Sequence, residues 1–346
     1  MSHVPDTPEG AGGSAASQSQ EAAEGSPPGW ATRLRPTGVS ATQGVGLLLL
    51  YVGMVVFFAW ASPFFLTVNN FLNIGTNIAY IGIMAVAMTM VIVSGGFDLS
   101  VGAVVALSAV TIAKIHDLDI DIWIAVAAAF AIGPVVGLVN GLIVTKVGIN
   151  PLITTLGTLS IVRGAAYVLT GGLTGTILDA SFAVIGRGSV MGIPVPMILL
   201  AVIFVAVHVV MTATPFGRNL YAIGGNAEAS RLAGVNVDRH RIAVYVLSGA
   251  SASIAGIVLA SQLGAGAPQS AQGVELSVIA AVILGGTSLS GGRGTVWGTL
   301  LGVIIMGTLN NGLALMRVSS FYQEIARGVV LLLAVGLDQL ASRRRR

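Results

Sequence analysis

Long apolar runs separated by short polar segments make up the chain from residue 44 onward. A helix needs about 20 predominantly apolar residues to cross the hydrocarbon core of a bilayer, with roughly 17 as a lower limit. Ten runs follow this pattern, although the third and the eighth are short and contain glycine. The predicted spans are Gly44–Leu66, Phe71–Val93, Leu99–Ile115, Ile122–Val144, Leu152–Leu169, Ile193–Ala213, Ile242–Leu263, Val274–Gly286, Thr295–Met316 and Tyr322–Leu340. The pattern predicts an all-α polytopic membrane protein.

Composition agrees with this fold class. Of the 346 residues, 54% are hydrophobic and 9% are charged, whereas soluble domains average about 25% charged residues. Residues 1–43 are rich in Ala, Gly, Ser and Pro and lack the basic start of a signal peptide, so we predict a disordered cytoplasmic tail. Residues 44–341 form the transmembrane domain, and 342–346 a basic cytoplasmic C-terminus. The chain has no cysteine, which excludes disulfides and thiolate chemistry.

The distribution of Lys and Arg predicts the orientation, because basic residues in short loops are retained on the cytoplasmic side. With the N-terminus inside, the cytoplasmic basic residues are Arg33, Arg35, Lys146, Arg218, Arg231, Arg239, Arg241, Arg293 and Arg343 to Arg346, and the outer ones are Lys114, Arg187 and Arg317. This bias predicts that both termini are cytoplasmic. It also places the polar segment Gly224–Arg241 in the cytoplasm.

Three segments of the first half resemble three segments of the second half in the same order. Asp98–Leu107 resembles Glu275–Leu284, Asn140–Val147 resembles Asn311–Val318, and Ile161–Leu169 resembles Ile325–Leu333. The matches pair span 3 with span 8, span 4 with span 9 and span 5 with span 10, so the predicted repeat units are spans 2–5 and 7–10. Because an odd number of spans separates the copies, they run in opposite directions. An inverted-topology repeat of this kind places the substrate path of transporters between the two halves.

The acidic and basic residues within the spans are candidates for the substrate path. Asp98 and Glu275 each precede or begin a short span, where a carboxylate either caps free backbone amides or takes part in a proton or ion relay. Arg163 lies near the middle of its span and must face protein or water. Arg327 lies nearer the outer edge, where its side chain can extend to the interface. Each arginine has either a structural partner or a place in the path.

Two asparagines end spans 4 and 9. Asn140 and Asn311 either meet the hydroxyls of a polar solute such as a sugar or hydrogen-bond across helices. Glycines at four-residue spacing in the same spans, among them Gly133, Gly137 and Gly141, predict close helix packing. His208 is interpreted as an interfacial polar residue. No catalytic or metal-binding motif occurs, so the sequence predicts no catalytic residue, no metal site and no bound cofactor.

The cytoplasmic segment Gly224–Arg241 has the pattern of a short capped helix. Asn226 is a capping residue, Glu228 falls in the first turn, and Gly234 can adopt the left-handed conformation that ends a helix. A helix of about two turns is not stable in water by itself and needs a surface on which to pack. Ala229, Leu232 and Ala233 give it a small apolar face.

These residues resemble a known family. "GGNAEASRLAGVNVDRHRIAVYVLSG", "ELSVIAAVILGGTSLSGGRGTVWGTLLG" and "LNNGLALMRVSSFYQEIARGVVLLLAV" are similar to the membrane permease of ribose-type sugar ABC importers, as are "SGGFDLSVGAVVALSA" and "NPLITTLGTLSIVRGAAYVLTGG". The resemblance extends from about Asn69 to Asp338. It implies a bacterial cytoplasmic membrane protein that translocates a monosaccharide or small polyol.

The resemblance also implies partners. It implies a permease homodimer, a periplasmic or extracellular sugar-binding protein, and a cytoplasmic subunit that binds ATP and Mg²⁺, with no nucleic acid partner. A cytoplasmic E-A-A-x-x-x-G segment of the family docks on the ATPase, and here Ser230 replaces its second alanine. The residues that the resemblance assigns to ATPase coupling are Asn226, Glu228, Ala229, Ser230, Arg231, Leu232 and Gly234.

A second function class fits part of the pattern. A stand-alone, ion-coupled secondary transporter would use Asp98, Glu275 and Arg163 as coupling groups. Such a transporter needs no docking surface for an ATPase, so the Gly224–Arg241 segment favours the ABC permease. An intramembrane enzyme has no constellation of residues to support it.

Overall fold

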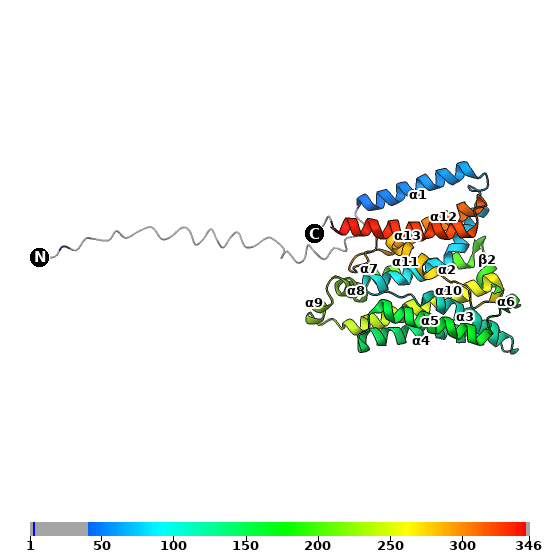
Figure 1. Cartoon of the computed structure of the whole chain (residues 1–346), viewed down its shortest axis with the longest axis horizontal. Helices are drawn as coiled ribbons and strands as arrows, with labels where there is room; N and C mark the ends of the chain where they lie inside the picture. The colour runs from blue at the N-terminus through cyan, green and yellow to red at the C-terminus, as the bar shows by residue number, and fades with distance from the viewer. Residues whose placement is uncertain (1–2, 4–40, 344–346) are drawn as a thin grey trace. The chain divides into compact units, whose positions relative to one another are not determined.

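The computed structural model describes residue 3 and residues 41–343. Residues 41–343 belong to one compact unit, in which the helices run side by side (Figure 1). The predicted tail lies outside the described residues except at residues 3 and 41–43. Positions 41–43 belong to the first helix, so the tail ends at least three residues earlier than predicted. Residues 342 and 343 likewise continue the last helix.

Helices occupy all ten of the predicted ranges within the described part of the chain. They are α1 (Ala41–Ala61), α2 (Val68–Val93), α3 (Val101–His116), α4 (Ile122–Leu142), α5 (Pro151–Thr170), α7 (Val195–Ala213), α10 (Val237–Leu263), α11 (Val274–Leu284), α12 (Val296–Leu315) and α13 (Ser320–Arg343). Among the described residues, six helices are long and apolar enough to cross a membrane: α2, α4, α5, α7, α10 and α12. The apolar helices at Val45–Ala61, Val101–His116 and Val274–Leu284 are shorter. The chain is thus a polytopic helical membrane protein, and ten crossings remain a prediction.

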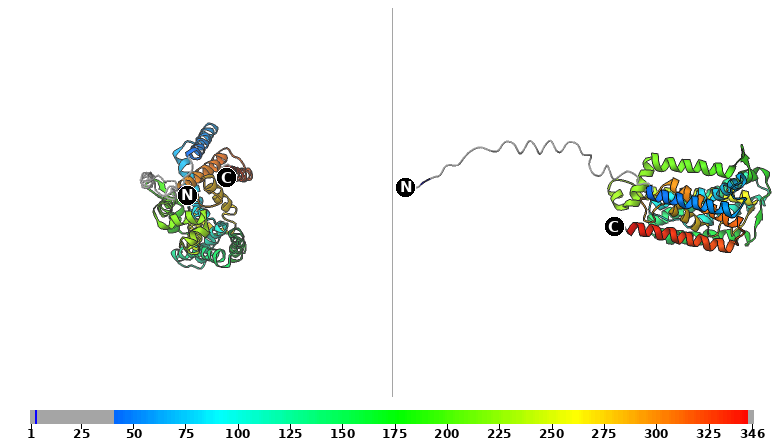
Figure 2. Two further views of the ribbon diagram at one scale, coloured as in Figure 1. Left: turned by 90° about the vertical axis from the view of Figure 1, so that its left-hand side faces the viewer. Right: turned by 90° about the horizontal axis from the view of Figure 1, so that it is seen from above.

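Short elements connect these helices. A π-helical turn, η1 (Ile143–Val147), extends α4, and α8 (Pro215–Gly225) and α9 (Ala227–Leu232) join α7 to α10. The strands are β1 (Gly175–Thr176), β2 (Ser189–Val190), β3 (Ile193–Pro194) and β4 (Ala265–Gly266). β1 pairs antiparallel with β4, and β2 pairs antiparallel with β3. These pairs lie at the end of the bundle opposite α9, as Figures 1 and 2 show.

The connecting helix α6 (Ala180–Arg187) lies at the same end as the strands. Asp179 caps it by accepting hydrogen bonds from the Ser181 hydroxyl (2.6 Å) and the Phe182 amide (2.9 Å). These two bonds favour the ionised carboxylate and hold the pKa of Asp179 below its ordinary value. The cap therefore stabilises the start of α6 at any pH at which Asp179 is ionised.

The core surrounds α2 and α10, which carry the longest runs of buried residues. Small residues allow α10 to approach its neighbours closely. Gly133 and Gly137 of α4 lie against the backbone of α10 at Gly249 and Tyr245, where a Cβ atom would collide. Close packing at these glycines, predicted from their spacing, is confirmed. Because lipid offers no hydrophobic driving force between helices, such backbone contact is a main source of their association.

The two central helices have corresponding neighbours. α10 packs against α3 and α4, whereas α2 packs against α11 and α12. In addition, α3 contacts α5, and α11 contacts α13. Each central helix therefore packs mainly against helices of the other predicted repeat unit. This arrangement is the one that a repeat of spans 2–5 and 7–10 leads us to expect, and the repeat itself remains a prediction.

Candidate functional site

The polar segment after α8 forms the short helix that its sequence predicts. The side chain of Asn226 accepts a hydrogen bond from the Ala229 amide (2.9 Å) and caps α9, with Glu228 in the first turn. At the other end, Gly234 has a φ of +85°. The Gly234 amide donates to Arg231 O and the Val235 amide to Ser230 O, both at 3.0 Å, which is a Schellman ending. The cap and the glycine stop predicted from sequence are both confirmed.

One face of α9 is open and the other is anchored. Ser230 is buried, and its hydroxyl donates to Asn226 O (2.8 Å). Leu232 is 83% exposed, and Ala229 and Ala233 are exposed as well. The apolar face of this two-turn helix is thus unpartnered in the described part of the chain. A helix this short depends on packing against a surface.

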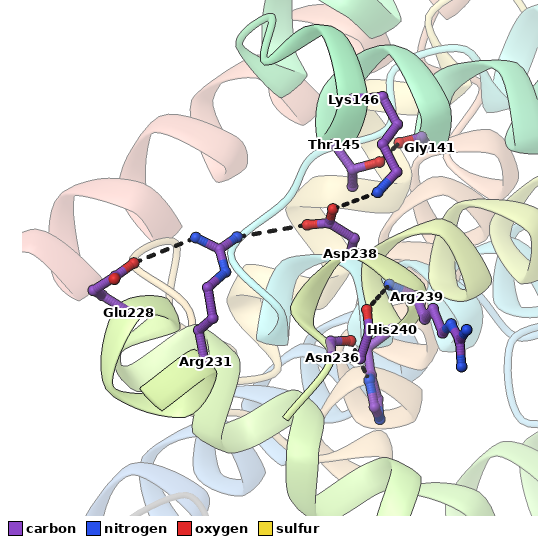
Figure 3. Close-up of polar contacts among 9 residues, drawn as sticks. All are labelled: Gly141, Thr145, Lys146, Glu228, Arg231, Asn236, Asp238, Arg239 and His240. Atoms are coloured by element: carbon purple, nitrogen blue, oxygen red, sulfur yellow. Dashed lines mark hydrogen bonds and ion pairs between the residues drawn. The ribbon is translucent and has the colours of Figure 1, made fainter. Parts of the chain in front are cut away.

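Ionic contacts connect α9 to the neighbouring elements (Figure 3). Arg231 Nη1 lies 3.4 Å from Glu228 Oε2, and Arg231 Nη2 lies 3.6 Å from Asp238 Oδ1 in the first turn of α10. Asp238 Oδ2 then lies 2.7 Å from Lys146 Nζ in η1. The four side chains form a chain of alternating charge. These contacts connect α9 to α10, and α10 to the end of α4.

His240 joins α8 to α10. Its Nδ1 lies 2.8 Å from Asn236 O, and its Nε2 lies 3.1 Å from the side-chain amide nitrogen of Asn219 in α8. With Nδ1–H donating to the carbonyl, Nε2 accepts from the Asn219 amide, which defines the neutral tautomer. The ring also stacks on Phe216 of α8, with centroids 5.2 Å apart. α8, α9 and the start of α10 are therefore linked as one unit. We call it the cytoplasmic module (residues 215–241), after the side of the membrane that the distribution of basic residues predicts for it.

Asp98 and Asn140 belong to one buried polar cluster. Asp98 Oδ1 accepts from the Ser100 amide (3.0 Å) and hydroxyl (2.6 Å), and Oδ2 accepts from the Ser248 hydroxyl of α10 (2.8 Å). Ser100 Oγ in turn accepts from Asn140 Nδ2 (3.0 Å). The Ser100 amide belongs to the residue before α3, and no side chain caps the first turn of α3, so this contact is not the cap on free helix amides that one interpretation predicts for Asp98. The carboxylate also ties α3 to α10, and Asn140 ties α4 to α3.

Arg163 and Glu275 form a second neighbourhood. Arg163 Nη1 donates to Pro268 O (2.8 Å) and Ser270 O (2.7 Å), in the loop before α11. This is the structural partner that one of the two sequence interpretations requires. Glu275, in the first turn of α11, lies against Gly102 of α3 and interacts electrostatically with Arg163, although no hydrogen bond joins the two in the described residues.

Asn311 and Arg327 lie apart from both clusters. Asn311 and Asn70 of α2 exchange reciprocal side-chain hydrogen bonds of 2.9 and 3.0 Å, so the cross-helix alternative holds for this asparagine as it does for Asn140. Asn311 also lines a cavity between α2, α10 and α12. The Nε atom of Arg327 in α13 is buried and has no hydrogen-bond partner among the described residues. The six candidate path residues thus fall into several groups rather than one site: Asp98 with Asn140, Arg163 with Glu275, and Asn311 and Arg327 apart from these.

Sequence reasoning missed two sets of residues. Asp238 and Lys146 complete the ionic chain, and only the fold brings these distant positions together. Asn73, Asn77 and Tyr80 form a polar stripe on α2 that faces the cavity. The spacing of this stripe, i, i+4 and i+7, is visible in the sequence as polar residues at helical period within an apolar run. That signal identifies the stripe without a structure.

The chain is similar to known transport proteins. A family model described as "Branched-chain amino acid transport system / permease component" matches residues 70–335. The chain is 44% identical over 302 residues to the ribose import permease protein RbsC of Bacillus subtilis (strain 168), covering 87% of this chain and 94% of that protein. It is 43% identical over 295 residues to RbsC of Escherichia coli (strain K12), covering 84% and 92%.

An arabinose protein is similar as well. The L-arabinose transport system permease protein AraH of Escherichia coli (strain K12) is 42% identical over 301 residues, covering 87% of this chain and 92% of that protein. No solved structure matches the chain.

Proposed function

The chain belongs to the family of transport-system permease components, and from that premise we propose that it is the membrane subunit of an ATP-driven sugar importer. The proposed cargo is a monosaccharide or related small polyol, crossing the cytoplasmic membrane of a bacterium. Relatives named as ribose and arabinose permeases align over almost their whole length, which supports a sugar of this size. The chain carries no ATPase motif, so ATP and Mg²⁺ are expected on a partner subunit.

The observation that carries the proposal is the cytoplasmic module. A capped two-turn helix with an exposed apolar face is not stable in water by itself, so we expect a soluble partner to cover that face. Glu228 and Arg231 flank this face with charge, which suits a groove on a soluble ATPase. In our proposal the coupling residues are those assigned from sequence, with Asp238, Lys146 and His240 added as the links to α10, η1 and α8.

We further propose how a partner's motion reaches the membrane. Closure of the ATPase would displace α9, and the Arg231–Asp238–Lys146 chain would transmit the displacement to α10 and η1. α10 contacts α2, α3 and α4, so its tilt would alter the core between the two predicted repeat units. The corresponding neighbours of α2 and α10 support an inverted repeat and a path between its halves.

The remaining parts of the proposal concern assembly. We expect two permease copies, usually identical, two ATP-binding subunits and a soluble sugar-binding protein on the outer side. Both termini are expected in the cytoplasm, with α9 on the same side. The bound cargo must be released, so the permease need not hold it tightly, and selection among sugars is expected to rest mainly with the binding protein.

Reconstitution tests the function. The chain is placed in proteoliposomes with its ATPase subunit, and uptake of radiolabelled D-ribose or L-arabinose is measured with the sugar-binding protein outside. We expect uptake only with ATP inside and all partners present. Uptake that runs on a proton or sodium gradient without ATP or a partner would overturn the proposal in favour of secondary transport.

A further inference from the structure

A cavity of about 770 Å³ opens within this single chain, at the end of the bundle opposite α9. Its walls come from the first half of α2, the last turns of α10 and α12, and the segment from α6 to β3. Its size falls within the range of roughly 300 to 1,000 Å³ that is usual for small-molecule sites. The cavity is distinct from the buried cluster around Asp98 and from the contacts of Arg163.

Carboxamide side chains converge on this cavity from three helices. Asn73 and Asn77 come from α2, Gln262 from α10, and Asn310 from α12. Gln262 Nε2 donates to Thr76 O (3.2 Å), which fixes one amide at the wall. The Oδ1 atom of Asn310 is buried and has no hydrogen-bond partner among the described residues. An acceptor in this condition is costly unless water or a ligand satisfies it.

Contacts other than those of Asn73, Asn77 and Asn310 hold the walls in place. The reciprocal Asn70–Asn311 bonds join α2 to α12 at the rim, and Arg187 Nε donates to Ser261 O (3.1 Å), which holds the end of α6 against α10. Of the four amides, Gln262 joins α10 to α2 through its bond to Thr76 O, and the other three are not needed to join the walls. Four amides within otherwise apolar helices indicate a function, because polar groups in lipid-embedded segments are kept at a cost.

The chemistry of the lining selects a class of ligand. Each amide offers a donor and an acceptor, which matches the donor and acceptor of a sugar hydroxyl. Tyr80 adds a ring and a hydroxyl, and Ile78 and Leu259 supply apolar surface for the C–H face of a sugar. The described lining contains no carboxylate and one charged side chain, Arg187, whose Nε already donates to Ser261 O, so the lining does not favour a cation. A neutral polyhydroxylated molecule fits this lining best.

We propose that this carboxamide cavity is a low-affinity monosaccharide site contained within one permease chain, in which Asn73, Asn77, Gln262 and Asn310 bind sugar hydroxyls. The identity of the ligand as a transported sugar rests on the proposed function. The site lies where a sugar released at the outer face would first meet the permease. Weak, multi-point binding there allows the sugar both to enter and to leave.

Direct binding to the purified chain tests the site. D-ribose is added to the permease in nanodiscs, without ATPase or binding protein, and saturation-transfer-difference NMR reports contact. We expect a signal for the parent and a signal reduced about fivefold for each hydrogen bond lost in Asn77→Leu and Asn310→Leu. Asn69→Leu is the matched control, since Asn69 is exposed on the same helix and lies outside the lining. It should retain the parent signal.

Two further measurements separate the possible failures. Asn77→Gln keeps the amide but displaces it by one methylene, and Tyr80→Phe keeps the ring but removes the hydroxyl. Both changes are small, so they remain informative if the leucine variants misfold, and each should weaken D-ribose binding. Parent-level binding and uptake in all four folded cavity variants would overturn the site while leaving the proposed function intact. Conversely, if the reconstituted parent shows no ATP-dependent uptake, the proposed function is overturned, whether or not D-ribose gives an NMR binding signal.

Discussion

Lys146 in η1 and Asp238 in the first turn of α10 form an ion pair 2.7 Å long, Nζ to Oδ2. The two residues are far apart in the sequence and belong to different helices. Asp238 is simultaneously 3.6 Å from Arg231 in α9 (Figure 3). This carboxylate is therefore the point at which α9, α10 and the end of α4 meet.

The first prediction concerns this carboxylate. The pair is partly exposed, so Asp238→Asn should lower the free energy of unfolding by less than about 1 kcal/mol. The variant nevertheless removes the contact between α9 and α10 and the contact between α10 and η1. ATP-dependent uptake should therefore fall strongly, although the free energy of unfolding changes little. Thermal unfolding and uptake are measured together. Asp238→Glu keeps a carboxylate that faces both Arg231 and Lys146, so it should retain more uptake than Asp238→Asn, and equal loss in the two variants would argue against the transmission.

The second prediction uses the end of α9. Gly234 has a φ of +85° and open space around it, so Gly234→Val costs about 1–2 kcal/mol from backbone conformation alone. We expect the permease to insert and fold while losing copurification with its ATPase. Gly192→Val is a matched control, because Gly192 has a φ of +82° and open space at the opposite end. Equal copurification of both variants with the ATPase would contradict a docking role for α9.

The sequence predicted the local elements of this protein well. Asn226 and Gly234 marked both ends of α9, because a cap and a left-handed glycine act within a few residues. Apolar runs similarly located the helices, with boundaries altered by a few residues. α10, for example, begins at Val237 rather than Ile242, since it extends beyond the apolar run into the cytoplasmic module.

Long-range neighbourhoods were not predictable in the same way. Asp98, Arg163 and Asn311 are all polar residues near or within apolar runs, and their sequence gave no sign that they occupy three separate places. Which helices face each other depends on packing at glycines such as Gly133 and Gly249. Periodicity reveals a face of a helix, but not the partner that covers it. The path residues therefore stay predictions. The polar stripe of α2 is visible in the sequence, but only the fold shows that it faces a cavity.

The third prediction tests glycine packing. A Cβ at Gly133 would collide with Gly249 O and with Ser253 Oγ, and a Cβ at Gly249 would collide with Gly133 O. Gly133→Leu should destabilise the bundle by about 1–3 kcal/mol or more through overpacking. Gly157→Leu in α5 is the control, since nothing lies within 4 Å of its added Cβ. Thermal unfolding in detergent should separate the two variants, and equal midpoints would show that the α4–α10 contact is not tight.

The fourth prediction concerns Arg163. Arg163→Leu leaves the carbonyls of Pro268 and Ser270 without their donor, at a cost of about 1–3 kcal/mol. The loop before α11 should loosen and uptake should fall. Arg163→Lys keeps the charge and a donor, so it should recover much of the loss. Arg317→Leu, at an exposed turn, should behave as the parent does. The maleimide labelling rate of Ser270→Cys reports the loosening of the loop, and sugar uptake is measured separately. If both are unchanged in Arg163→Leu, this arginine has no such role.

The fifth prediction concerns orientation. The distribution of basic residues places α9 in the cytoplasm and the β2–β3 turn outside. Leu232 is 83% exposed and Met191 is 98% exposed, so a cysteine at either position can react with a maleimide. The parent chain has no cysteine and provides a blank background. In intact spheroplasts, a membrane-impermeant maleimide should label Met191→Cys and leave Leu232→Cys unlabelled, and inside-out vesicles should reverse the result. The opposite pattern would show that the topology is the reverse of the predicted one. α9 would then lie on the side of the membrane away from ATP, which contradicts its proposed role.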